Sequence, residues 1–104
     1  MATFLFTYHG GGDMGTPEQQ QQVMAAWEAW FHGLGAAVKD PGNPGGATKV
    51  VAQGGVVTDG GPTSPTGYSL ISAGSLDEAV SAAKGCPVLG AGGMVEVTEI
   101  LEVM

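Results

Sequence analysis

The sequence has no arginine and three lysines, against ten aspartate and glutamate residues, so the chain of 104 residues carries a formal net charge of −7. Nucleic acids and anionic membrane surfaces are bound through lysine and arginine, and an acidic protein is repelled by their phosphate groups. The charge balance therefore argues against nucleic acid and membranes as partners.

The sequence also has a single cysteine, Cys86. One cysteine forms no internal disulfide, so nothing points to an oxidising compartment. Cys86 stands beside Pro87 without a base nearby in the sequence, and we interpret it as structural. No stretch approaches the roughly 18 apolar residues that span a bilayer, and the start lacks the basic segment and long apolar core of a signal peptide. We therefore predict a cytoplasmic protein.

Signals for metals and cofactors are equally sparse. The two histidines stand in no recognised metal-ligand spacing. The run Gly10-Gly11-Gly12-Asp13 precedes a predicted helix, as phosphate loops do, but no lysine follows, and Asp13 and Glu18 have the wrong charge for an anion. We predict a flexible loop over Gly10–Gly15, and neither a metal nor a cofactor.

What the sequence does contain is typical of one folded domain covering residues 1–104, since 43% of the residues are hydrophobic and 12% are charged. So short a domain buries a modest fraction of its surface. Pairing with a second copy would therefore be a natural source of stability.

Periodic patterns predict three elements in the first half. Thr3–Tyr8 is rich in β-forming residues and is predicted to be a strand. Thr16 is a good helix N-cap, and Gln19 completes a capping box for the helix that follows. Ala36–Asp40 is predicted to be a second strand. The apolar stripe of the helix consists of Val23, Trp27, Trp30, Phe31 and Leu34.

The second half is predicted to contain a hairpin, a strand, a helix and a last strand. Ser75 and Glu78 form a capping-box pattern at the start of the helix, and Gly85 ends it. The hairpin spans Thr48–Ala52 and Val56–Thr58, and the two strands span Gly67–Ala73 and Met94–Ile100. In the last strand, Val95 and Val97 are predicted to face inward, and Glu96 and Thr98 outward.

The order strand-helix-strand therefore occurs twice, once on each side of the hairpin. This order predicts an α+β domain of the ferredoxin-like plan, βαβ–hairpin–βαβ, with an antiparallel sheet and both helices on one of its faces. The other face would be bare, and a row such as Phe4, Phe6 and Tyr8 would form an exposed apolar patch there. Two sheets packed face to face would cover it, so we predict a homodimer.

A series of short segments carries a family resemblance that spans nearly the whole chain. In order, they are Phe4-Leu5-Phe6-Thr7-Tyr8, Trp27-Glu28-Ala29-Trp30-Phe31, Ala37-Val38-Lys39-Asp40-Pro41-Gly42, Val57-Thr58-Asp59-Gly60, Gly67-Tyr68-Ser69-Leu70-Ile71, Ser75-Leu76-Asp77-Glu78-Ala79 and Val95-Glu96-Val97. By these segments the chain resembles the YCII-related family, within the dimeric α+β barrel superfamily. The resemblance implies a homodimer with a cleft between helix and sheet. In the subgroup named for Asp-Gly-Pro-Phe, Pro and Phe stand where Gly61 and Pro62 follow Asp59-Gly60 here.

His9 and Asp40 are the residues to which we assign a catalytic role. Each stands at the end of a predicted strand, and the two strands of a βαβ unit run parallel, so both ends lie at one edge of the sheet. His9 would act as general acid or base, since histidine titrates near neutral pH, and Asp40 would orient it. The alternatives are a surface histidine and a turn-forming aspartate that accepts backbone hydrogen bonds.

Four further residues are candidates for a ligand pocket. Trp27 and Trp30 lie three positions apart on the first helix, where two large rings would line a pocket for an apolar or aromatic molecule. Asp59 and Tyr68 lie near the end of the hairpin and would reach the same cleft. Core packing for the aromatic residues and a turn role for Asp59 are the alternatives.

Three functions remain open on these grounds. The first is a homodimer that holds a small, partly apolar organic molecule in a cleft, with cofactor-independent proton transfer of the isomerase or lyase type by His9 and Asp40. The second is a ligand-binding or regulatory dimer module without turnover. The third is a purely structural dimerisation domain.

Overall fold

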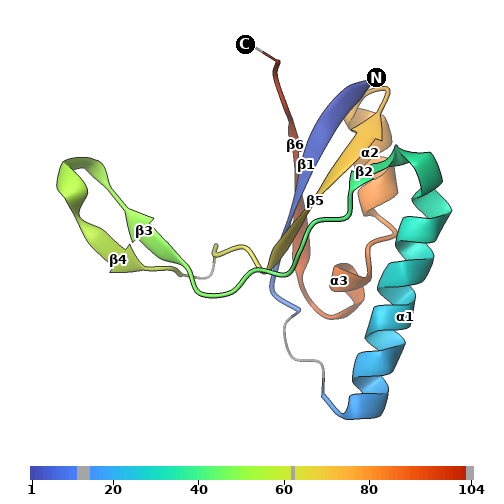
Figure 1. Ribbon diagram of the computed structural model, residues 1–104, viewed down its shortest axis with the longest axis horizontal. Coiled ribbons are helices and arrows are strands. Elements are labelled where there is room, and N and C mark those ends of the chain that lie inside the picture. The colour runs from blue at the N-terminus through green and yellow to red at the C-terminus, as the bar shows by residue number, and fades with distance from the viewer. Residues whose placement is uncertain (12–14, 62, 103–104) are drawn as a thin grey trace.

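The computed structural model describes residues 1–11, 15–61 and 63–102 (Figure 1). Residues 12–14 of the predicted loop over Gly10–Gly15 lie outside these ranges, as does Pro62. The elements in chain order are β1 (Ala2–His9), α1 (Pro17–Leu34), η1 (Gly35–Ala37), β2 (Val38–Asp40), β3 (Lys49–Val51), η2 (Gln53–Gly55), β4 (Val57–Asp59), β5 (Gly67–Ala73), α2 (Leu76–Ala83), α3 (Pro87–Gly90) and β6 (Met94–Glu99).

Four strands form the main sheet in the order β2-β5-β1-β6, and all neighbouring pairs are antiparallel. Because β1 and β2 are joined through α1, and β5 and β6 through α2, this order is that of a ferredoxin-like domain. The predicted α+β fold is confirmed. The predicted hairpin is present as well, as a separate two-stranded sheet of β3 and β4.

The two main helices begin where their caps predict. Thr16 and Gln19 form a reciprocal capping box at the start of α1, in which each side chain bonds the backbone N–H of the other residue, at 3.2 and 2.9 Å. Ser75 accepts a hydrogen bond from the backbone N–H of Glu78 at the start of α2. No helix in the described part of the chain is both long enough and apolar enough to cross a membrane.

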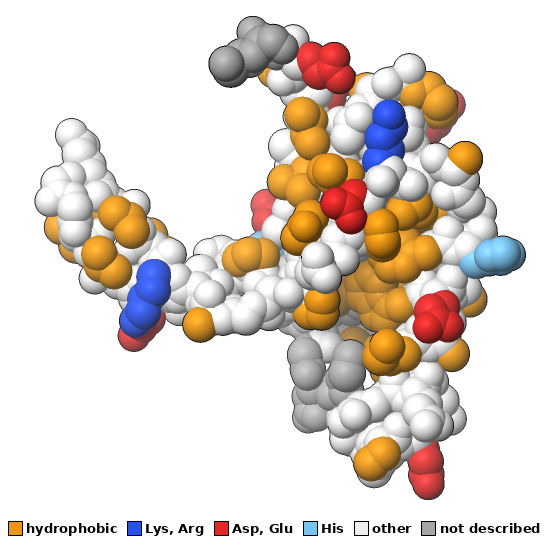
Figure 2. Space-filling view, viewed as in Figure 1, with side chains coloured by type: hydrophobic (Ala, Val, Ile, Leu, Met, Phe, Trp, Pro, Cys, Tyr) orange, Lys and Arg blue, Asp and Glu red, His pale blue; other side chains and the backbone are white. Residues whose placement is uncertain are grey.

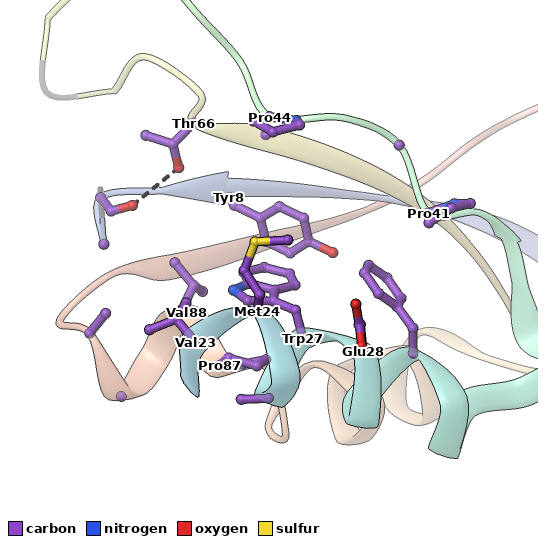
Figure 3. A pocket seen from close by; sticks show the side chains of 18 of the residues that line it. Tyr8, Val23, Met24, Trp27, Glu28, Pro41, Pro44, Thr66, Pro87 and Val88 are labelled. Carbon is purple, nitrogen blue, oxygen red and sulfur yellow. Dashed lines mark hydrogen bonds between the residues drawn. The ribbon is translucent and has the colours of Figure 1, made fainter. Parts of the chain in front are cut away.

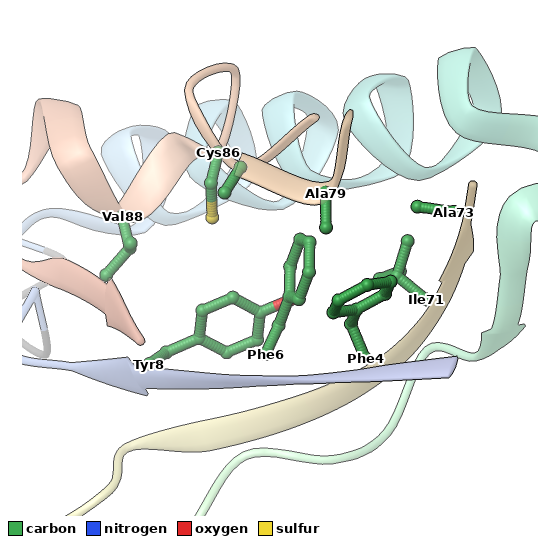
Figure 4. Close-up of a cluster of buried hydrophobic side chains, with 9 residues drawn as sticks. Phe4, Phe6, Tyr8, Ile71, Ala73, Ala79, Cys86 and Val88 are labelled. Carbon is green, nitrogen blue, oxygen red and sulfur yellow. The ribbon is translucent and has the colours of Figure 1, made fainter. Parts of the chain in front are cut away.

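The hydrophobic core lies between the main sheet and the helices (Figure 4). Phe4, Phe6 and Tyr8 all point into it, with Phe4 and Phe6 fully buried. The expectation that this row forms the bare face of the sheet is therefore wrong. The aromatic stripe of α1 packs against the aromatic row of β1, with Phe6 beside Trp30.

On the opposite side of the main sheet the described residues form no helix, and we call this side the open face. The register places on it, as cross-strand neighbours, Thr3, Leu5, Thr7 and His9 of β1, Tyr68, Leu70 and Ser72 of β5, and Met94, Glu96 and Thr98 of β6. Glu96 and Thr98 therefore face outward, as predicted, while Val95 and Val97 pack against the core.

The hairpin stands away from the rest of the molecule as an arm, which we define as residues 48–60 (Figure 1). It gives the molecule a broad, flat outline of 44 × 41 × 18 Å. Its strands are held by their own ladder and by a hydrogen bond between Gly60 N and Thr48 O at 3.0 Å.

Candidate functional site

A cavity of about 1090 Å³ lies between α1, the segment Pro41–Gly45 and α3 (Figure 3). One wall comes from successive turns of α1, because side chains three and four positions apart share a helix face. The opposite wall is the segment that follows β2, together with the start of β5. The apolar side chains that line the cavity include Tyr8, Val23, Met24, Ala26, Trp27, Phe31, Pro41, Pro44, Pro87, Val88 and Ala91.

Tyr8 and Trp27 meet inside this lining, at the boundary between cavity and core. Their ring centroids are 4.8 Å apart and their planes are at 80°, an edge-to-face contact. Trp27 is half-buried, so part of the ring remains available to the cavity. Figure 3 shows Tyr8, Met24 and Trp27 gathered in front of the sheet.

A short hydrogen-bond chain fixes Tyr8. Its hydroxyl donates to Ser69 Oγ at 2.8 Å, and Ser69 Oγ donates to the carbonyl oxygen of Pro41 at 2.6 Å. Burial raises the pKa of the Tyr8 phenol well above its usual value. The ring therefore stays neutral and serves as a positioned wall rather than as an acid or base at neutral pH.

The charge of the lining is low. Glu28 is the sole formally charged residue among the described residues that line the cavity, and it is exposed to solvent. Polar uncharged groups complete the rim, namely those of Gln19, Gln22, Asn43 and Thr66. Such a lining suits a neutral or cationic molecule with an apolar body better than an anion.

A glycine allows the second wall to approach the sheet. Gly42 has a φ of +73°, and a Cβ there would lie 1.7 Å from the carbonyl oxygen of Tyr68. Only glycine fits both the left-handed backbone and this approach. The backbone N–H of Gly42 also donates to Asp40 Oδ1 at 2.8 Å, which closes the turn after β2.

Two of the four predicted ligand-binding residues line the cavity and two do not. Trp27 lines it with its ring, and Tyr68 borders it at the start of β5, where the register turns the Tyr68 side chain to the open face. Trp30 lies behind Trp27, where its indole N–H donates to the carbonyl oxygen of Ala82 at 3.0 Å, so it connects α1 to α2. Asp59 lies on the exposed arm and forms an ion pair with Lys49.

His9 lies on the open face and does not line the cavity. Its Nδ1 is 3.2 Å from the carbonyl oxygen of Ser64, so this nitrogen carries the hydrogen and donates. Its Nε2 is buried within ion-pair distance of the Glu96 carboxylate, although the pair lacks hydrogen-bond alignment. The imidazole is 5% exposed, whereas the Glu96 side chain is 63% exposed.

Asp40, the partner expected for His9, is exposed and accepts the hydrogen bond from Gly42. The strands β1 and β2 do run parallel, but β5 lies between them. Their ends are thus separated by two strand spacings, about 10 Å. Glu96 takes the position beside His9 because β6 is the direct neighbour of β1.

Sequence reasoning missed Glu96 as a partner of His9 and Ser69 as the partner of Tyr8. It also missed Pro41–Gly45 as a cavity wall. For Glu96 a signal was available, because an antiparallel β1–β6 pair places it diagonally across from His9. No comparable signal marks Pro41–Gly45, whose place depends on the whole fold.

Cys86 is buried, and burial raises the pKa of its thiol to about 11. This agrees with a structural role. Across residues 1–11, 15–61 and 63–102, no three histidine, cysteine or acidic side chains gather as a metal site requires.

Comparison with known proteins adds a similarity of fold. The chain is similar to the solved structure of 5-chloro-2-hydroxyhydroquinone dehydrochlorinase (TftG) from Burkholderia phenoliruptrix AC1100 in complex with 2,5-dihydroxybenzoquinone. The alignment covers 92% of this chain and 91% of that one, with 23% sequence identity and a TM-score of 0.53. No protein-family model and no curated protein matches the chain. The comparison therefore supports the fold, and membership of the YCII-related family stays a prediction.

Proposed function

We propose that this chain binds a small, partly apolar organic molecule in the cavity beside Trp27, and that it does so as a homodimer. The observation that carries the proposal is the cavity itself, whose walls are aromatic and aliphatic and whose rim is polar. Ligand cavities typically combine such walls with a few polar groups and have volumes of roughly 300–1,000 Å³.

The similar fold supports a small-molecule role. The dehydrochlorinase structure contains 2,5-dihydroxybenzoquinone, a ligand with a single ring. A ring of that size fits easily in a cavity of about 1090 Å³. For this chain, however, Glu28 and the absence of a lysine or arginine from the described lining favour an uncharged ring over an anionic one.

The open face supports the homodimer. Leu5 and Leu70 are half-buried cross-strand partners at its centre, while Tyr68 and Met94 are 40% and 59% exposed. A second copy packed on this face would cover these side chains and remove them from water.

Cavity binding is tested with Nile red, a neutral dye that fluoresces in apolar surroundings. Ala26 lines the cavity, and Ala25, beside it on α1, does not; both are exposed. We expect Ala26→Trp to fill the cavity and weaken dye binding at least tenfold, and Ala25→Trp to leave it within twofold. Equal binding by both variants would contradict the proposed site.

Proton transfer by His9 is a second candidate, favoured by the contact of a buried imidazole with a carboxylate. Because Nδ1 donates to Ser64 O, that carbonyl would orient the ring and Nε2 would take the proton. Glu96, beside Nε2, would then stabilise the imidazolium that forms, in place of the Asp40 that the sequence predicts. Because His9 points to the open face, which the second copy would cover, the reaction would take place between the two protomers. Its class would be a cofactor-independent isomerisation or elimination.

The substrate of the similar protein, 5-chloro-2-hydroxyhydroquinone, provides an assay for elimination. One hydroxyl proton moves to the chlorine-bearing carbon, and the base then takes the proton of a second hydroxyl. The electrons of that O–H bond form a carbonyl while the carbon–chlorine bond breaks, so chloride leaves with the bonding pair and a hydroxybenzoquinone remains. We expect His9→Ala to lower chloride release at least 100-fold, Glu96→Gln to lower it about tenfold, and Asp40→Asn to leave it within twofold. Unchanged rates in His9→Ala would refute this mechanism without affecting the binding proposal.

A further inference from the structure

The arm lacks a hydrophobic core of its own. Its four valines, Val50, Val51, Val56 and Val57, are between 47% and 70% exposed. Val51 and Val57 are cross-strand partners on one face of the arm, next to the Lys49–Asp59 ion pair. Val50 and Val56 lie on the other face. Figure 2 shows apolar side chains exposed on the visible face of the arm, which stands apart from the body.

An isolated two-stranded hairpin is marginally stable in water, and needs further strands or a helix against it. Among the described residues of its own protomer the arm has neither, and it extends the radius of gyration to 14.9 Å. A compact chain of this length has a radius of gyration of about 13 Å. The apolar residues of the arm therefore call for a surface outside the protomer.

We propose that the arm packs against a second copy of this chain, so that each protomer of the homodimer holds the other with its arm. This inference rests on the homodimer of the proposed function and adds the element that joins the two copies. The arm is an interaction surface whose partner is a surface of the same protein.

The base of the arm supports a second copy as the partner, because it is fixed to the end of the open face. After β4 the chain returns to β1, where Ser64 O faces His9 Nδ1 at 3.2 Å and Thr66 N donates to Tyr8 O at 2.7 Å. A copy packed on the open face would therefore meet the arm directly. The arm and the open face would form one continuous interface.

Length and charge fit the same partner. Each arm strand, with its half of the turn, has about six residues and reaches roughly 20 Å, which exceeds the width of a four-stranded sheet, about 14 Å. The arm carries one lysine and one aspartate, which pair with each other, so its net charge is zero. A neutral arm approaches a chain of charge −7 without repulsion.

Two variants test the arm. In Val51→Thr/Val57→Thr the β-branched shape and strand preference remain, but the apolar surface is lost. In the second variant, Asn-Gly replaces residues 49–59. Because Gly60 N already donates to Thr48 O, two residues are enough to close a turn between them. Val80→Ala on α2 is the control, since Val80 is 38% exposed and lies outside both the arm and the open face.

The measurements are sedimentation velocity over a dilution series and amide hydrogen exchange of the arm peptide. We expect a wild-type dimer whose arm exchanges at least tenfold more slowly than the arm of the diluted monomer. Both arm variants should raise the dimer dissociation constant at least tenfold, and Val80→Ala should leave it within twofold.

Two results would overturn the inference while leaving the dimer of the proposed function in place. They are a dimer whose dissociation constant is unchanged in both arm variants, and an arm that exchanges equally slowly in dimer and monomer. A protein that stays monomeric at every concentration would overturn both the arm and the dimer. Nile red binding, measured separately, then shows whether the cavity proposal stands.

Discussion

The rings of Tyr8 and Trp27 meet edge to face, with centroids 4.8 Å apart, and this contact joins the first strand to the wall of the cavity. Tyr8 belongs at once to the core and to the cavity lining. Changes that loosen Tyr8 should therefore affect both stability and binding.

The hydrogen-bond chain from Tyr8 through Ser69 to Pro41 predicts that removing either hydroxyl lowers the free energy of unfolding, and that the two losses differ. Tyr8→Phe removes one bond, while Ser69 still donates to Pro41, so the free energy of unfolding should fall by about 1 kcal/mol. Ser69→Ala leaves the Tyr8 hydroxyl and the Pro41 carbonyl without this partner, and should cost about 2–3 kcal/mol. Urea denaturation at one fixed protein concentration measures both. A larger loss in Tyr8→Phe would contradict the assigned direction of the chain.

The turn at Gly42 predicts a second pair of outcomes. Gly42→Ala would place a Cβ against the Tyr68 carbonyl oxygen at a positive φ, and should lower the free energy of unfolding by about 3 kcal/mol or more. Gly46→Ala is the matched control, because nothing lies within 4 Å of its Cβ position. The control should stay within about 0.5 kcal/mol of the wild type. Equal melting temperatures of the two variants would show that the turn at Gly42 takes up the added methyl group without cost.

Local signals in the sequence were sufficient for most of the fold. The caps at Thr16 and Ser75 marked the helix starts, and alternation in Met94–Ile100 gave the correct faces of β6. The face of β1 was mispredicted, because alternation separates two sets of side chains without saying which set is covered. That depends on α1, whose aromatic stripe packs on the row of Phe4, Phe6 and Tyr8.

The candidate site was harder to predict because it depends on strand order and loop paths. Parallel strands in a βαβ unit suggested that His9 and Asp40 meet, but the insertion of β5 separates them. Trp27 lies in the cavity lining, and its role in binding stays a prediction. Trp30 belongs to the same stripe, but it stands three positions further along the helix and faces α2. Its indole N–H donates to the carbonyl oxygen of Ala82 there.

Burial of Cys86 predicts a thiol that is inert in the folded protein. With a pKa of about 11, almost none is thiolate at pH 8, and the buried sulfur is closed to reagents. Reaction with Ellman's reagent should therefore be at least 100-fold slower than in denaturant. A native rate equal to the denatured rate would contradict the buried position.

The same pKa shift predicts a loss of stability at alkaline pH. A folded pKa of about 11, above the ordinary thiol value of 9.0, means that the folded state holds the thiol proton more tightly. The protonated thiol therefore contributes to the free energy of unfolding in full below pH 9. This contribution, on the order of 2 kcal/mol, is lost as the pH rises toward 11. Cys86→Ala should show a shallower loss of stability between pH 9 and 11 than the wild type. Identical slopes would show that other groups, Tyr8 among them, account for the alkaline loss.

The two helix caps allow stability and binding to be separated. Thr16→Ala and Ser75→Ala each remove an N-cap, and each should lower the free energy of unfolding by about 1 kcal/mol. Of the two capped first turns, the one in α1 borders the cavity, through Gln19, whose backbone N–H donates to the Thr16 hydroxyl that the substitution removes. Thr16→Ala should therefore weaken Nile red binding severalfold, while Ser75→Ala leaves it within twofold at the same loss of stability. If both variants weakened binding equally, the dye would be reporting overall stability rather than the α1 wall, and the cavity beside Trp27 would lose its support as the binding site.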